Sequence, residues 1–98
     1  MTNQKQVNAA RRVLHAYAHD PAAREVAPSV LAALDEARRR AAVQERALGA
    51  ACVAARESRN RATKALCKRH GEAQALLIAV TNAAARLRAR LNASSSSV

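Results

Sequence analysis

The sequence predicts an all-α protein: a small antiparallel helical bundle or hairpin built on one long central helix, with two shorter flanking helices and coiled-coil-like packing. Alanine, the strongest helix former, supplies 27 of the 98 residues. Only two glycines and two prolines interrupt the chain, and residues that favour strands are scarce. Apolar residues also recur at intervals of three and four, which is the spacing of one helix face.

The first helix is predicted over residues 4–19, where Asn3 and Gln6 can form a capping box. Asp20 and Pro21 should end it, because the residue before a proline avoids the α-helical region. With a second proline at Pro28, residues 20–28 are predicted to form a bent connector. The apolar stripe of this helix comprises Val7, Ala10, Leu14 and Tyr17.

The long central helix is predicted over residues 29–70, a stretch without proline. Gly49 inside it costs about 1 kcal/mol of helix stability without breaking the helix, and a break there is the alternative. The seam alternates steps of four and three residues, as in a coiled coil. It includes Val30, Leu34, Ala37, Ala41, Leu48, Ala51 and Ala55.

Gly71 follows Lys68, Arg69 and His70 and is predicted to stop the long helix. A third helix should then run over residues 72–92, with a heptad pattern of Ala73, Leu77, Val80, Ala84, Leu87 and Leu91.

Residues 1–93 are predicted to form a single domain and residues 94–98 a flexible serine-rich tail. Large apolar side chains are few, with 18 Leu, Ile and Val in all, so self-association would help to stabilise the fold. A homo-oligomer or a helical protein partner is therefore expected. The residues predicted to pack helices within or between chains are Leu34, Leu48, Leu77, Val80, Leu87 and Leu91.

The two cysteines, Cys52 and Cys67, fall within the predicted long helix. Fifteen residues of continuous helix span roughly 22 Å, well beyond the limit of about 7 Å between the Cα atoms of a disulfide. A disulfide is therefore disfavoured, and a reducing compartment is the simpler expectation. No signal-peptide core and no membrane span are found in the sequence. The expected location is cytoplasmic or virion-associated.

The net charge of +10 is concentrated in residues 56–69, where six basic residues accompany one acidic residue, Glu57. Arginine and lysine at this density favour binding of a polyanion, above all nucleic acid. The alternative is a solvated face in an arginine-rich protein, since arginine outnumbers lysine by 14 to 3. The basic residues concerned are Arg56, Arg59, Arg61, Lys64, Lys68 and Arg69, with a second, separate group of Arg86, Arg88 and Arg90.

His15 with His19, and Cys67 with His70, have spacings that allow two metal ligands on one helix. No motif requires them to meet, so no metal site and no cofactor are expected. Cys67 with His70 is also a nominal nucleophile and base, but without an oxyanion hole or a pocket. The chain is therefore expected not to be an enzyme.

The first functional hypothesis is a non-enzymatic, oligomeric helical protein whose basic surface binds nucleic acid with little sequence preference. A single aromatic residue, Tyr17, offers no platform for stacking bases. The alternative hypothesis is a helical assembly or adaptor protein that binds a protein partner, as in a virion, a secretion apparatus or a chaperone.

Overall fold

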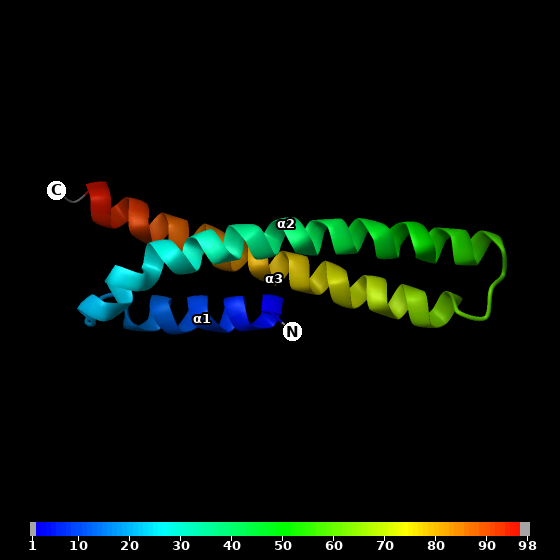
Figure 1. The fold of residues 1–98 in the computed structure, drawn as a ribbon, viewed down its shortest axis with the longest axis horizontal. Helices are drawn as coiled ribbons and strands as arrows, with labels where there is room; N and C mark the ends of the chain where they lie inside the picture. The colour runs from blue at the N-terminus through cyan, green and yellow to red at the C-terminus, as the bar shows by residue number, and fades with distance from the viewer. Residues whose placement is uncertain (1, 97–98) are drawn as a thin grey trace.

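The computed structural model describes residues 2–96, and it describes side chains for residues 3–93. The chain forms three helices, α1 (Thr2–Ala16), α2 (Pro21–Glu57) and α3 (Thr63–Ser96). Figure 1 shows that α2 and α3 form a long antiparallel hairpin and that α1 packs along one half of it. Residues 2–96 contain no strand. The all-α class and the small helical bundle with a long central helix are thus confirmed.

The connector predicted over residues 20–28 is wrong, because α2 already begins at Pro21. Asp20 caps the helix, and its Oδ1 accepts a hydrogen bond of 3.0 Å from the backbone N–H of Ala22. Proline is well suited to the first helical position, where its missing N–H would have no partner. Pro28 lies inside the helix, and in Figure 1 the first turns of α2 run obliquely to the rest.

Packing explains why α2 continues through Pro28. Ala23, Ala27 and Leu34 lie on one face and are buried, so a helix through this region places them in the core together. The Arg24 guanidinium also reaches back to the carbonyl oxygen of Tyr17, at 3.1 Å. Burial of this face outweighs the local cost of the proline.

The predicted helix over residues 29–70 is also wrong, because the chain reverses at residues 58–62. The backbone N–H of Asn60 donates to the carbonyl of Ala55, and that of Arg59 donates to Arg56. This pair of bonds is a Schellman motif, and Arg59 takes the left-handed position with φ of 52°. The Asn60 side chain then caps the next helix by accepting from the N–H of Ala62 at 2.8 Å.

Gly71, predicted to stop a helix, lies within α3. Its φ is negative, as it is for Gly49, so neither glycine serves as a left-handed cap. The third helix begins at Thr63, so its predicted start at residue 72 is wrong. Helix α3 extends to Ser96, into the predicted tail of residues 94–98, and residues 97 and 98 lie outside the described residues.

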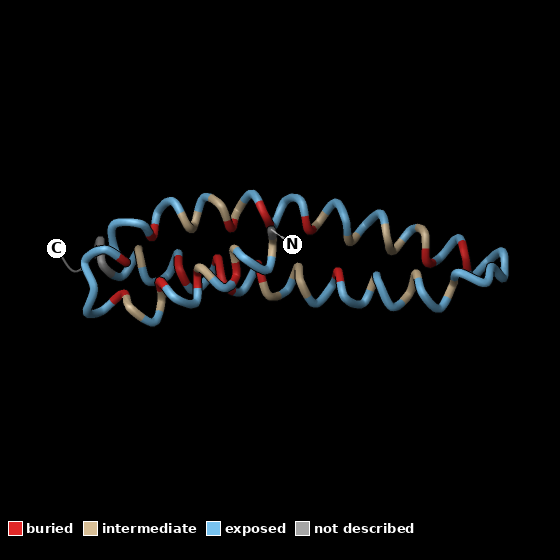
Figure 2. The backbone as a smooth tube through the Cα atoms, turned by 60° about the horizontal axis from the view of Figure 1, so that its bottom comes forward, coloured by how far each residue is buried: buried red, intermediate tan, exposed pale blue. Residues whose placement is uncertain are grey.

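The core lies where all three helices meet. Figure 2 shows buried positions concentrated at the end of the molecule that carries α1. Of the predicted packing residues, Leu34, Val80 and Leu87 are completely buried within this chain and Leu91 packs against the same core. Leu48 and Leu77 are only partly buried. The molecule measures 58 × 21 × 15 Å, and its distal arm, the part of the hairpin beyond α1, is formed by α2 and α3 (Figure 1).

Cys52 on α2 and Cys67 on α3 form a disulfide across the distal arm. The expectation against this bond was wrong, because it assumed one continuous helix. With the chain reversed at residues 58–62, the Cα atoms are 5.2 Å apart, inside the range that a disulfide requires. The expectation of a reducing compartment rested on a disfavoured disulfide, so the observed bond removes its basis.

Candidate functional site: the basic hairpin tip

The hairpin tip, defined as residues 56–69, consists of the last turn of α2, the reversal and the first turns of α3. All six of its basic residues are exposed. They are Arg56 on α2, Arg59 and Arg61 in the reversal, and Lys64, Lys68 and Arg69 on α3.

The reversal changes how these cations are arranged. On one straight helix, residues 56–69 would spread over about 20 Å at 1.5 Å per residue. In the hairpin, the end of α2 lies beside the start of α3 and both close one end of the molecule (Figure 1). The disulfide between Cys52 and Cys67, which itself belongs to the tip, holds the two helices together at the base of the tip. The positive charge is therefore gathered at one end.

The electrostatics of the tip favour an anion. Glu57 is its one acidic residue, and the first turn of α3 contains no acidic side chain. A helix N-terminus carries a partial positive charge, so Lys64 there adds like charge to it. The Asn60 side chain caps this terminus, but an amide carries no charge, so no acidic side chain of the first turn offsets the positive charge of α3 there.

The second basic group does not join the tip. Arg88 forms an ion pair with Asp35 at 2.7 Å, joining α3 to α2. Arg90 lies over the Tyr17 ring, 5.4 Å from its centroid, where a cation–π contact is favourable. Arg86 lines a cleft between α1 and α3. Arg88 therefore joins α3 to α2, and Arg90 joins α3 to the turn that follows α1.

The metal-ligand candidates occupy different ends of the molecule. His15 and His19 face each other edge to face, 6.5 Å between ring centroids, where α1 ends. His70 lies on the distal arm, with its Nε2 2.9 Å from a carboxylate oxygen of Glu45. Cys67 is bonded to Cys52 and has no free thiol. Among the residues that the structure describes, no three His, Cys, Asp or Glu side chains cluster as metal ligands do.

The reversal and the disulfide were both missed from the sequence, although a signal for each was present. Residues 56–61 form a run of six polar residues between apolar seams, and the asparagine in it, Asn60, is of a type preferred as an N-cap. The two cysteines lie symmetrically on either side of Arg59 and Asn60. A hairpin centred there would have paired them.

Comparison of the chain with protein family models, with curated proteins and with solved structures finds no match. Over residues 2–96, no helix is both long enough and apolar enough to cross a bilayer.

Proposed function

We propose that the protein binds a polyanion, namely nucleic acid with little sequence preference, through the hairpin tip. The observation that carries this proposal is the convergence of six exposed cations with one carboxylate at the end of a two-helix arm. Arginine and lysine at such a site contact phosphate oxygens, and each phosphate neutralised releases condensed counterions.

The composition of the tip argues for phosphate contacts over base recognition. The tip contains no aromatic residue, so it lacks a stacking surface for unpaired bases. Two packed helices, each about 10 Å wide, also exceed the width of the major groove of about 12 Å. The tip would therefore lie across the phosphate backbone, which carries no sequence information directly.

Fluorescence anisotropy with a labelled DNA duplex and a labelled single strand, over a salt series, tests the proposal. Replacing Arg61, Lys64 and Lys68 with glutamate should weaken binding strongly. It should also reduce the slope of log affinity against log salt concentration by the amount expected for about three phosphate contacts. The matched control replaces Arg12, Arg38 and Arg46, which are also exposed but lie outside the tip. Salt-independent binding, or equal losses in both triple variants, would contradict the proposal.

A second candidate function is that of an assembly or adaptor protein, self-associating or binding a protein partner. Two valines of α2 support it, because Val43 is 66% exposed and Val53 is 52% exposed. Light scattering of the purified protein, with and without nuclease treatment, reports oligomer size and bound nucleic acid together. If this candidate is right, replacing both valines with aspartate lowers the measured mass, whereas the triple replacement at the tip does not.

A further inference from the structure

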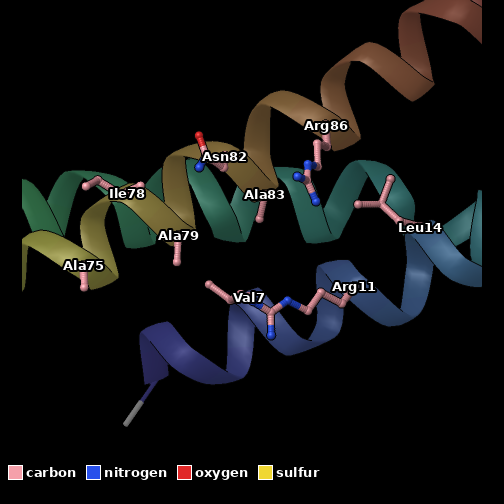
Figure 3. A pocket seen from close by; sticks show the side chains of 9 residues that line it. All are labelled: Val7, Arg11, Leu14, Ala75, Ile78, Ala79, Asn82, Ala83 and Arg86. Carbon is pink, nitrogen blue, oxygen red and sulfur yellow. The ribbon is translucent and has the colours of Figure 1, made fainter. Parts of the chain in front are cut away.

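A cleft of about 320 Å³ lies between α1 and α3, away from the hairpin tip. Figure 3 shows its walls: Val7 and Leu14 rise from α1, and Ala79 and Ala83 face them from α3. These four side chains belong to the apolar part of the lining, and the Asn82 amide on α3 adds a polar group to it. The volume lies at the lower end of the range for small-molecule sites.

Two arginines flank this apolar surface, one from each helix. Figure 3 shows Arg11 extended along α1 toward Val7 and Arg86 extended from α3 toward the cleft. No carboxylate lines the cleft. Within the described part of the chain, neither arginine has an ion-pair partner, in contrast to Arg88 nearby. The cleft therefore combines uncompensated positive charge with an apolar surface.

A third observation is Ile78, which lines the same cleft and remains 60% exposed. Large aliphatic side chains gain free energy when they leave water, by about 25 cal/mol per Å² of apolar surface. An occupant with an aliphatic portion would cover Ile78. An occupant with an anionic end would match the two arginines, since guanidinium and carboxylate form paired, charge-assisted hydrogen bonds.

We propose that the cleft between α1 and α3 binds a linear aliphatic carboxylate. Its carboxylate lies between Arg11 and Arg86, and its chain lies along Ala75, Ile78 and Ala79. A small inorganic anion would leave the apolar wall exposed, and a neutral alcohol would leave the two guanidinium groups without an anionic partner. The site is separate from the tip, so the two kinds of binding are independent.

An NMR titration with decanoate, kept below its micelle-forming concentration, tests the site. The expected result is saturable one-site binding with shifts centred on the methyl groups of Val7, Leu14 and Ile78. Decanol and acetate should each bind at least tenfold more weakly, because each supplies only one of the two chemical features. Equal binding of decanol, or shifts spread evenly over the molecule, would overturn the proposal.

Variants separate this site from the general attraction of a basic protein for anions. Replacing Arg11 and Arg86 with glutamine should weaken decanoate binding at least tenfold. The control replaces Arg12 and Arg38, which removes the same charge from other exposed positions, and it should retain binding. If both double variants lost the same affinity for decanoate, net charge alone would explain the binding and the proposed site would be rejected.

A third variant changes the shape of the cleft and leaves its charge intact. Ala75 lines the cleft and is exposed, so Ala75→Leu should fill part of the space without disturbing the fold. It should weaken decanoate binding severalfold, and far-ultraviolet circular dichroism should confirm unchanged helix content. Unchanged decanoate affinity in this variant would place the binding elsewhere.

Discussion

The imidazole of His70 fills the space beside Gly49, so closely that a Cβ added to Gly49 would lie 2.9 Å from Nε2 of His70. The same nitrogen lies 2.9 Å from a carboxylate oxygen of Glu45. Gly49 therefore permits α3 to approach α2 with a histidine between them. Its role is close packing, since its backbone is helical.

Gly49→Ala should consequently have two opposing effects. Alanine improves helix propensity by about 1 kcal/mol, but its methyl group displaces His70 from Glu45. We expect the stabilisation to be smaller in the wild-type background than in a His70→Ala background, where the full 1 kcal/mol should appear. Urea unfolding of the four proteins in this double-mutant cycle measures the difference. Additive effects would contradict the contact.

Removal of the disulfide should destabilise the distal arm. A cross-link that closes a loop of about 15 residues contributes about 3 kcal/mol by restricting the unfolded chain. The double variant Cys52→Ser with Cys67→Ser should therefore unfold at lower urea concentration than the oxidised protein. A reducing agent should lower the stability of the wild type to that of the variant and leave the variant unchanged. A wild type insensitive to reduction would argue against the bond.

Arg59→Gly should stabilise the protein while weakening any contact with a polyanion. Arg59 adopts a left-handed backbone with φ of 52°, which costs a residue with a side chain about 1–2 kcal/mol, whereas glycine adopts it freely. We expect an increase of about 1 kcal/mol in the free energy of unfolding. The affinity for nucleic acid should fall, and the slope of log affinity against log salt concentration should decrease by the amount expected for about one phosphate contact. Arg59→Ala separates the two effects, because it removes the charge but keeps the strained backbone.

Arg88→Ala should destabilise the protein, whereas Arg86→Ala should not. Arg88 donates to Oδ2 of Asp35, and Oδ1 of the same carboxylate is buried without a hydrogen-bond partner in the structure. Loss of Arg88 leaves this partly buried charge unpaired, at a cost of about 1–3 kcal/mol. Arg86 has no such partner among the described residues. Thermal unfolding of the two variants side by side provides the comparison.

The fold class and most core positions could be predicted from the sequence, because they depend on periodicity. The heptad residues Ala73, Val80, Ala84 and Leu87 are all buried. Helix ends were harder to predict, because local signals competed with packing. Pro28 and Gly71 look like helix stops, yet tertiary packing carries the helices through them.

The residues of the hairpin tip could be predicted from the sequence, but their arrangement in space could not. The six cations of the tip are evident from the sequence, since no tertiary information is needed to count them. Their predicted position along one helix was wrong, because Arg59 occupies a position where glycine is the usual signal for a helix end. The cleft between α1 and α3 could not be predicted, since it depends on how two distant segments pack.

Helix α1 covers only one end of the α2–α3 hairpin, so the two ends of the molecule should open to solvent to different extents. Where α1 packs, amide protons should exchange slowly, because opening requires three helices to separate. The distal arm has no third helix, so its amides should exchange through smaller openings that Cys52 and Cys67 limit. The end of the molecule that carries α1 should therefore be rigid, and the distal arm should be more flexible. A partner that binds the far end of the distal arm is therefore separated from the three-helix core by the half of the hairpin that α1 does not cover (Figure 1).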